Sequence, residues 1–428
     1  MSNTNVIIQK ASLLPAMFLV AGCCVGGGML ALPVASGASG LFPSLFMMSL
    51  CWIGMTLSAL LLVEASLWME EEAHVITITS RLLGPVFKVI AWVLFLYISY
   101  ASEVAYAAGG GLQTANWLNS LFGLNLTKDF GTVLITVIFT TVIVFGGRVV
   151  GRVNSILFTS LIGAYFLLIS FGADEVKPEL LLKSNWSKSY LAIPLLLTAF
   201  SFQTMVPSLT PILKRQTKAL KLSIIGGTTI ALIIYAIWQM LILGIVPAEG
   251  PNGLIEANKL SLPATEFLYE HVSGKWVVPV ANYFAFFAII TSYLAMGLGL
   301  FDFLSDGLKI PKKGWGNLIL CLLIIVPTSI FATQFERAFM VAMETSGGYG
   351  DTILNGMIPV LLIWVGRYKK GYNHSSFRVP GGKPLLIGVF LFFMIALGIE
   401  VGIQTNLLGS GSHQAVEKIE IQTPPVVE

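Results

Sequence analysis

The stretch AGCCVGGGMLALP (residues 21–33) places glycine at positions 22, 26, 27 and 28, in the middle of a long apolar run. Glycine inside a helix costs roughly 1 kcal/mol relative to alanine, so this cluster indicates either the close approach of another backbone or a broken helix. Gly22 and Gly26 have the spacing of a small-residue packing face between membrane helices. The three consecutive glycines at 26–28 favour a break. The rest of the chain helps to decide between a packing face and a broken helix.

The composition is that of a membrane protein. Of the 428 residues, 55% are hydrophobic and 11% are charged, and the mean hydropathy is +0.82. Soluble globular proteins carry about 25% charged residues, so this chain lies outside their range. The net charge of +3 is small and its basic residues lie in short loops, which gives no indication of a nucleic-acid partner. We therefore expect an all-α polytopic protein embedded in a lipid bilayer.

The four cysteines all fall inside apolar runs. This placement excludes a disulfide framework and leaves no metal-binding spacing of the CxxC type, so we predict neither a metal nor a cofactor. The first apolar run continues past the length of a signal-peptide core and has no convincing cleavage site. We expect it to be retained as a helix.

Crossing a hydrocarbon core about 30 Å thick takes about 20 apolar residues in a helix. This length predicts eleven transmembrane helices, at 12–36, 43–66, 86–111, 131–147, 153–171, 190–211, 221–246, 277–302, 315–333, 337–365 and 384–405. Residues 1–11 precede the first span, and a polar C-terminal tail, 406–428, follows the last. The longest loop, 247–275, is acidic and contains an amphipathic stretch at 262–272, which suits a surface helix; a disordered connector is the alternative.

The basic residues predict the orientation. With a cytoplasmic N-terminus and eleven spans, the 25 Lys and Arg residues divide 17 inside to 8 outside. This bias follows the positive-inside rule. We expect the N-terminus in the cytoplasm, the C-terminus outside, and the loop 247–275 as an external cap.

A second interruption lies in the sixth predicted span. The stretch AFSFQTMVPSLTPIL (residues 199–213) contains Pro207 and Pro211, preceded by the polar residues Ser201, Gln203 and Thr204. Proline removes a backbone donor and clashes with the preceding turn, so this helix is expected to break near the bilayer midplane. The two breaks thus fall in spans one and six.

This spacing is typical of transporters built from two inverted repeats of five helices, in which freed backbone groups of the broken helices form the substrate site. We assign 12–171 to the first repeat, 190–365 to the second, and 384–405 to an extra helix. The N–H groups of residues 26–28 carry the positive end of a helix dipole and can bind a carboxylate. Freed carbonyls opposite them can take an ammonium group or a cation, which suits a zwitterion.

The broken spans also carry a family resemblance. VAGCCVGGGMLALP and SFQTMVPSL resemble the first and sixth spans of the hydroxy and aromatic amino acid permease family, and ITSYLAMGLGLFDFLSDGLK (290–309), AYAAGGGL and NGMIPVLLIW agree with other spans. The similarity covers nearly the whole chain. It implies a fold of the leucine-transporter type and proton-driven uptake, with tyrosine as the leading substrate. Cys23-Cys24 stands where the family usually has a threonine pair, and Phe202-Gln203 where it has Phe-His.

The candidate substrate-binding residues lie at the breaks and on the third span. A pocket lined by aromatic side chains, with Tyr293 and Tyr349 as further candidates, would hold the substrate ring, and Ser201 or Gln203 would meet a phenol hydroxyl or an indole N–H. The predicted set is Cys23, Cys24, Gly26, Gly27, Gly28, Tyr106, Phe200, Ser201, Phe202, Gln203 and Thr204.

Carboxylates inside membranes are costly and therefore mark candidates for ion coupling. Glu103 lies deepest in a span, Glu344 adjoins the glycine-rich stretch TSGGYGD, and Glu64 and Glu400 lie nearer helix ends, where they could reach water. Each could be a structural acid instead. A sodium site at Thr291 and Ser292 is the alternative coupling device, unless these hydroxyls bond back to their own helix.

Other polar residues suit other roles. Asp302 and Asp306, at the inner end of span eight, are expected to act as a latch or as lysine partners. His74 and His271 fall in loops, so a histidine proton relay within the membrane is not expected.

The sequence thus predicts a secondary transporter of the bacterial cytoplasmic membrane that imports an aromatic amino acid with a proton by alternating access. A sodium-coupled symporter or exchanger of another neutral amino acid is the alternative, as is a sensor with the same fold. No HExxH, GxSxG or phosphate-binding motif occurs in the spans, so neither an enzyme nor an ATP-driven pump is expected.

Overall fold

The computed structural model describes residues 3–69, 73–272, 276–335, 337–372, 377–405 and 407–408. Within these ranges every regular element is a helix, and the only extended pairing is an isolated bridge between Gly40 and Ser184. The prediction of an all-α protein is confirmed. Of the polar tail 406–428, all but residues 407 and 408 lie outside the described residues.

The predicted spans coincide with helices in the structure. The elements are α1 (Asn3–Cys24), α2 (Gly27–Ser36), α3 (Leu41–Leu67), α4 (Val75–Leu83), α5 (Pro85–Phe122), α6 (Lys128–Val144), α7 (Gly147–Gly172), η1 (Ala173–Glu175), α8 (Pro178–Leu182), η2 (Trp186–Ala192), α9 (Ile193–Ala199), η3 (Gln203–Met205), α10 (Val206–Ile212), α11 (Thr217–Ile245), α12 (Leu254–Leu260), η4 (Ala264–Glu270), α13 (Val277–Leu308), α14 (Trp315–Gln334), α15 (Ala338–Thr345), the π-helix η5 (Ser346–Met357), α16 (Ile358–Tyr368) and α17 (Gly382–Gln404).

Among the described residues, eight helices are each long and apolar enough to cross a membrane, and α1 with α2 forms a ninth, bent candidate. The two remaining predicted spans correspond to α6, which has 17 residues, and to the interrupted run from α9 to α10. The eleven-span count and its division into two repeats therefore stay predictions, as does the orientation of the termini.

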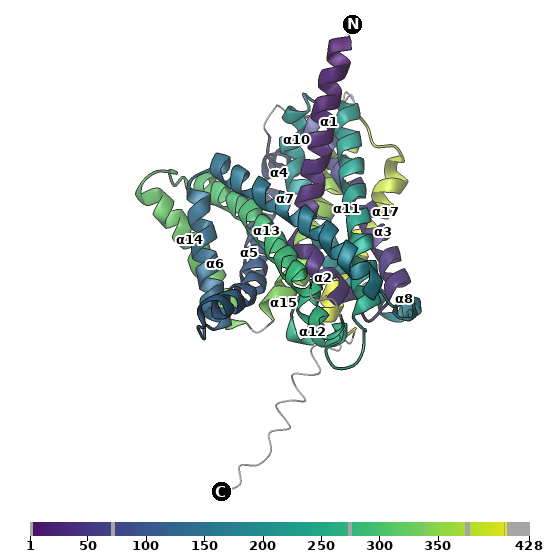
Figure 1. Ribbon diagram of the computed structural model, residues 1–428. Helices are drawn as coiled ribbons and strands as arrows, with labels where there is room; N and C mark the ends of the chain where they lie inside the picture. The colour runs from purple at the N-terminus through teal and green to yellow at the C-terminus, as the bar shows by residue number, and fades with distance from the viewer. Residues whose placement is uncertain are drawn as a thin grey trace.

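The helices form two groups (Figure 1). In the first, α1 packs along α11, and α3 packs against α9, α10 and α11. In the second, α13 crosses α7 and α5, while α6 and α14 lie together at one side of the molecule and reach the rest through α5 and α13. The C-terminal helix α17 covers η5.

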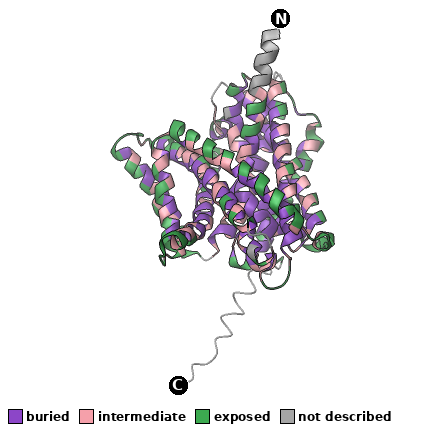
Figure 2. Cartoon of the chain, viewed as in Figure 1, coloured by how far each residue is buried: buried purple, intermediate pink, exposed green. Residues whose placement is uncertain are grey.

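Burial follows this arrangement (Figure 2). Buried residues concentrate where the two groups meet, and exposed residues lie on the outward faces of the helices. Many of the exposed side chains are large and apolar, including Phe18, Val86 and Ile395, at 52%, 69% and 63% exposure. An apolar outer face is what a lipid environment requires.

The long loop is ordered where the structure describes it. It contains α12 and η4, so the predicted amphipathic stretch 262–272 forms a short 3₁₀ helix, and the disordered alternative is wrong for these residues. Both elements pack on α2, and Arg337, next to α15, donates to Ser261 Oγ at 3.1 Å and to Asn258 O at 3.1 Å. The loop therefore covers one end of the broken first span.

Glycine permits a close contact between the backbones of α5 and α6. A Cβ atom on Gly131 would lie 2.1 Å from Gly111 O, and one on Gly111 would lie 2.7 Å from the backbone of Thr132. Backbone atoms cannot move aside as the tip of a flexible side chain can. The contact therefore requires glycine on both helices.

Gly131→Ala should consequently separate α5 from α6 and lower the free energy of unfolding by about 1–3 kcal/mol, the usual cost of overpacking. Thermal unfolding of the detergent-purified protein measures this. Gly163→Ala is the matched control, because a Cβ at that helical position would meet nothing within 4 Å. Equal melting temperatures for the two variants would contradict the role of the contact.

Candidate functional site

Both predicted breaks are present. α1 and α2 meet at 53°, with Gly26 between them in an extended conformation at φ −166° and ψ −152°. In the sixth span, α9 ends at Ala199 and α10 begins at Val206, so Pro207 occupies the first turn of α10. Proline is well tolerated there because the first N–H groups of a helix have no partner within it. The α-helix is therefore interrupted from residue 200 to residue 205, where non-helical residues 200–202 are followed by the 3₁₀ turn η3.

Tyr235 on α11 joins the two breaks. Its hydroxyl oxygen lies 2.5 Å from Cys24 O, at the end of α1, and 2.7 Å from Ala199 O, at the end of α9. These are carbonyls that each helix leaves without an intrahelical donor. One turn further along α11, Trp238 Nε1 donates to Met29 O at 2.9 Å. Helix α11 thus satisfies backbone groups of both broken spans.

The glycines serve close approach as well as the break. The N–H of Gly27 donates to Ser292 Oγ at 2.9 Å. A Cβ on Gly26 would lie 2.0 Å from that hydroxyl oxygen, and one on Gly27 would lie 2.7 Å from Cε1 of Tyr106. Gly22 differs, because a Cβ there would make an ordinary 3.4 Å contact with Phe158. The glycines at 26 and 27 therefore let α13 and α5 reach the start of α2.

A small buried cavity of about 40 Å³ lies between the breaks. Its lining residues are Cys23, Cys24, Gly26, Gly28, Ile98, Ser102, Tyr106, Thr198, Ala199, Ser201, Ser292, Met296 and Asp351. This volume holds a few water molecules, since one water needs roughly 10–15 Å³ on this scale. The structure thus brings together parts of α1, α2, α5, α9, α13 and η5 at one point.

Several predicted substrate residues do not line the cavity: Gly27, Phe200, Phe202, Gln203 and Thr204. Gln203 is fully buried and its amide is engaged, because Oε1 accepts from Phe202 N at 2.9 Å and Nε2 donates to Met55 O at 3.1 Å. The phenyl ring of Phe200 packs edge-on against Tyr235 at 5.1 Å. Gln203 therefore ties the unwound segment to α3 in this structure.

Asp351 is the functional candidate that the sequence analysis missed. It lies in the π-helix η5, is fully buried, and lines the cavity. Its Oδ1 accepts from Ser201 Oγ and from Asn355 Nδ2, both at 2.6 Å, while Oδ2 has no hydrogen-bond partner among the described residues. A carboxylate within the glycine-rich run 346–356 of an apolar span was the available signal, and π-helical segments often mark functional sites.

Glu103 does not line the cavity, although its neighbour Ser102 does. It is fully buried on α5, where the phenol of Tyr293 interacts with its carboxylate, but no hydrogen bond of good geometry reaches either oxygen among the described residues. A Cβ on Gly297 of α13 would lie 3.3 Å from its Oε1, so the carboxylate packs directly on that helix. Tyr293, another residue predicted to line the pocket, hydrogen-bonds to Thr140 at 2.8 Å and also interacts with Glu103. Tyr106 interacts electrostatically with both Glu103 and Asp351.

The other candidate acids have different surroundings. Glu64 and Glu400 are 1% and 0% exposed, so the expectation that they reach water is wrong for this structure. Glu400 accepts from Gln404 Nε2 at 2.9 Å and packs against Gly348 of η5. Glu344, on α15, and Tyr349, on η5, are partly exposed, and neither lines the cavity.

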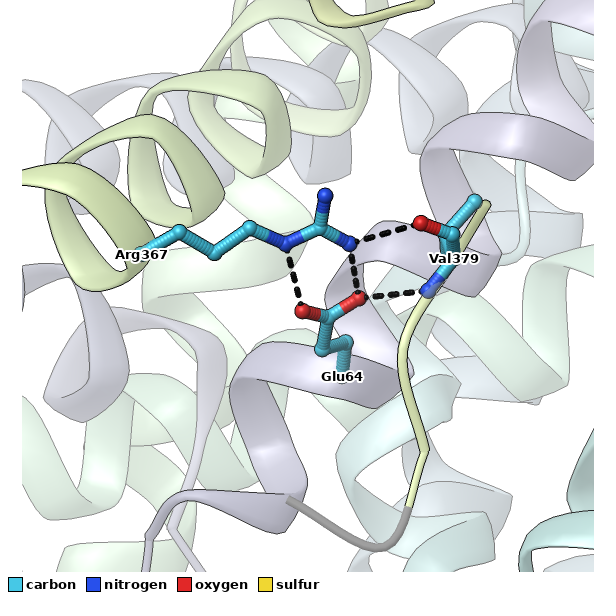
Figure 3. A network of polar contacts seen from close by, with 3 residues as sticks. All are labelled: Glu64, Arg367 and Val379. Carbon is cyan, nitrogen blue, oxygen red and sulfur yellow. Dashed lines mark hydrogen bonds and ion pairs between the residues drawn. The ribbon is translucent and has the colours of Figure 1, made fainter. Parts of the chain in front are cut away.

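Glu64 forms a buried ion pair with Arg367 (Figure 3). The guanidinium of Arg367 donates to both carboxylate oxygens, at 2.7 and 2.5 Å, and also to Val379 O at 2.9 Å. The N–H of Val379 in turn donates to Glu64 Oε2 at 2.8 Å. The network joins α3, α16 and the segment before α17, which favours a structural role for Glu64.

The hydroxyls proposed for sodium are already bonded. Thr291 Oγ1 donates to Phe287 O of its own helix at 2.7 Å, and Ser292 Oγ accepts from Gly27. Across the described residues, no group of three or more His, Cys, Asp or Glu side chains could hold a metal ion. Asp302 pairs with Lys312 at 2.8 Å, as expected for a lysine partner.

The two histidines lie outside the long helices. His74 is the N-terminal cap of α4, and His271 Nε2 lies 2.9 Å from Asn252 O. Their positions agree with the expectation that they fall in loops.

Comparisons with known proteins give a consistent result. A family model described as the tryptophan/tyrosine permease family matches residues 9–400. A tryptophan-specific transport protein of Haemophilus influenzae is 28% identical, with 92% of this chain and 97% of that protein covered. Tyrosine-specific transport system 1 of the same organism is 29% identical, with 91% and 96% covered. The low affinity tryptophan permease of Escherichia coli K12 is 26% identical, with 90% and 94% covered.

A solved structure shares the fold. The crystal structure of MhsT in complex with L-phenylalanine superposes with a TM-score of 0.59 at 15% identity, covering 90% of this chain and 97% of the other. The fold is therefore of the leucine-transporter type, as the family resemblance implied.

Gly27→Val should weaken amino acid binding by about tenfold to 100-fold, since displacing Tyr106 costs roughly 1–3 kcal/mol. The protein should still insert into the membrane, because the change adds only apolar atoms. Equilibrium binding of labelled amino acid measures the effect. Gly22→Ala, in the same span, should bind as the unchanged protein does, and equal binding by Gly27→Val would remove this glycine from the site.

Glu64→Gln should lower the free energy of unfolding by about 3–5 kcal/mol, because it leaves the Arg367 charge buried without its partner. Asp302→Asn breaks an ion pair whose side chains are 43% and 51% exposed, so it should cost less than about 1 kcal/mol. Thermal unfolding of the purified variants compares the two. A stable Glu64→Gln protein would show that the network in Figure 3 is dispensable.

Proposed function

The chain belongs to the tryptophan/tyrosine permease family, and we propose that it imports tyrosine across the bacterial cytoplasmic membrane by symport with a proton. The observation that supports this proposal most directly is that two broken membrane helices, α1–α2 and α9–α10, meet at one buried cavity. Membranes tolerate irregular backbone where it lines such a site. Relatives at 28% and 29% identity are named for tryptophan and for tyrosine, which supports an aromatic substrate of either kind.

The substrate carboxylate would bind at the start of α2. Gly26 and Gly28 line the cavity there, and the first N–H groups of a helix lack intrahelical acceptors and carry the positive end of its dipole. Glycine leaves these groups accessible to a ligand. The substrate ring would lie toward α5 and α13, against Tyr106 and Met296.

Admission of a tyrosine needs a larger space than 40 Å³. The cavity walls come from both helix groups: α1, α2 and α9 on one side, and α5 and α13 on the other. A rocking motion of the bundle α1–α2, α3, α9–α10 and α11 against the other helices would therefore widen the site toward one membrane face at a time. This is the alternating access that we propose.

Glu103 is the proposed proton carrier. An ionised carboxylate without a cationic partner is costly to bury, so such a group can take up a proton when its surroundings close. Tyr106 lines the cavity where substrate would bind and interacts electrostatically with Glu103, which would couple the two sites. Sodium coupling is less well supported, because Thr291 bonds to its own helix and Ser292 to Gly27.

Uptake of labelled tyrosine into proteoliposomes tests the proposal directly. We expect accumulation under an imposed proton gradient, little under a sodium gradient, and inhibition by tryptophan and phenylalanine more than by leucine. Accumulation driven by sodium alone would overturn proton coupling. Binding of amino acids without accumulation would identify a sensor with the same fold.

Glu103→Gln should abolish the dependence of uptake on the pH gradient while leaving exchange of labelled for unlabelled substrate measurable. The amide has nearly the same shape as the carboxylic acid but cannot release a proton. Counterflow and gradient-driven uptake, measured on the same preparation, separate these effects. Unchanged gradient dependence would move the coupling role to another acid, such as Glu344.

A further inference from the structure

Asp351 lines the same cavity as the start of α2, and its carboxylate has an unfilled acceptor. Asp351 is fully buried, and two donors, Ser201 Oγ and Asn355 Nδ2, orient its Oδ1 at 2.6 Å. Its Oδ2 has no partner among the described residues. Because Ser201 belongs to the unwound part of the sixth span, the carboxylate is fixed directly to one of the two breaks.

No Lys, Arg or His is among the residues that line this cavity. An ionised carboxylate that is buried without a partner is costly, so Asp351 either holds a proton or pairs with a cation, and since the cavity lining supplies no cation, its surroundings are suited to one that arrives from outside the protein. In contrast, Glu64 already has Arg367 as its partner and offers no such acceptor.

The backbone carbonyls at the breaks are less available to a cation. Cys24 O and Ala199 O both point at the hydroxyl of Tyr235, at 2.5 and 2.7 Å. The proton of that hydroxyl is donated to these oxygens, which reduces their capacity to accept from a ligand. Asp351 is the one carboxylate among the residues that line the cavity, and its unpaired Oδ2, which is closed off in this structure, would become accessible to a ligand as the cavity widens.

We propose that Asp351 binds the α-ammonium group of the substrate, with Ser201 and Asn355 as positioning residues. The inference rests on the proposed function, since it concerns the same cavity. In an α-amino acid the ammonium and carboxylate groups share one carbon atom, so both must be bound within a short span. Asp351 and the glycines Gly26 and Gly28 line one cavity, so both groups of the amino acid can be bound there.

The assignment predicts selectivity for the amine. The test compares the binding of tyrosine with that of 3-(4-hydroxyphenyl)propionate, which keeps the ring and carboxylate but lacks the ammonium group. Competition against labelled tyrosine on the purified, full-length protein gives the ratio of the two dissociation constants. In the unchanged protein this ratio should be on the order of 100, as for a buried charge pair that loses one partner.

Asp351→Asn should reduce this ratio of dissociation constants to a few-fold, because the affinities for both ligands should change. Tyrosine should bind more weakly, and the deaminated analogue should bind more tightly than it does to the unchanged protein, because the repulsion between two carboxylates is removed. A general loss of structure would weaken both ligands together. Asp302→Asn, which removes an exposed carboxylate on α13, should leave the ratio unchanged.

Other outcomes overturn the inference. An Asp351→Asn protein that keeps the ratio but loses gradient-driven uptake would show that this carboxylate carries the proton. If that variant does not fold, Ser201→Ala tests the same geometry: it should lower the ratio about threefold to tenfold, since it removes one donor to the carboxylate. An unchanged ratio in a folded Ser201→Ala protein would count against the assignment.

If the proposed function is wrong, the binding experiment gives a result that differs from all of these outcomes. If the unchanged protein binds neither tyrosine nor tryptophan, the proposed substrate is wrong. The ratio can then be measured with the neutral amino acid that it does bind and with the deaminated form of that amino acid, which tests Asp351 independently.

Discussion

Within a bilayer every backbone polar group must find a partner inside the protein, and this requirement governs the two broken helices. At the first break, Gly27 N–H is satisfied by Ser292 and Cys24 O by Tyr235. At the second, Ala199 O is satisfied by the same Tyr235 and Phe202 N by Gln203. Each partner comes from a side chain placed by α11, by α13 or by the unwound segment itself. The breaks persist because these side chains replace the hydrogen bonds that a continuous helix would make.

The number of hydrogen-bond partners also distinguishes the buried acids from one another. Glu64 has a full set of partners in Arg367 and Val379, and it joins elements that must stay together. Glu103, Asp351 and Glu400 are equally buried, but each has a carboxylate oxygen without a hydrogen bond of good geometry among the described residues. Burial alone therefore does not distinguish a structural acid from a functional one. The presence or absence of a cationic partner does, because an unpaired buried charge is costly and an exchangeable cation can relieve it.

The placement of the cavity links binding to motion. Gly26 and Gly28 belong to one helix group, whereas Tyr106 and Ser292 belong to the other. A ligand held between them contacts both groups, so its binding energy can favour one relative position of the groups over another. The glycines that allow the close approach of Tyr106 also allow the bend between α1 and α2. In the alternating access that we propose, the same few residues act as site and as hinge.

The sequence by itself determined the all-α class, the positions of the long helices and the places of both breaks, but not every helix end: α5 runs to Phe122, beyond the predicted 111, and α1 begins at Asn3, before the predicted 12. Those features are local: an apolar run of sufficient length forms a helix in lipid, and glycine or proline within it interrupts the hydrogen-bond ladder. Seven predicted site residues also meet at the cavity, namely Cys23, Cys24, Gly26, Gly28, Tyr106, Ser201 and Ser292.

Tertiary structure alone decided which acid faces the cavity and which is paired. Asp351 is 150 positions from Ser201, and Arg367 is 303 positions from Glu64, so neither contact leaves a trace in local composition. Gln203 adjoins the break in sequence, yet its amide turns toward Met55 of α3 and away from the cavity. The direction of a side chain at an irregular backbone position depends on the helices packed around it, and a single sequence does not specify that packing by any periodic pattern.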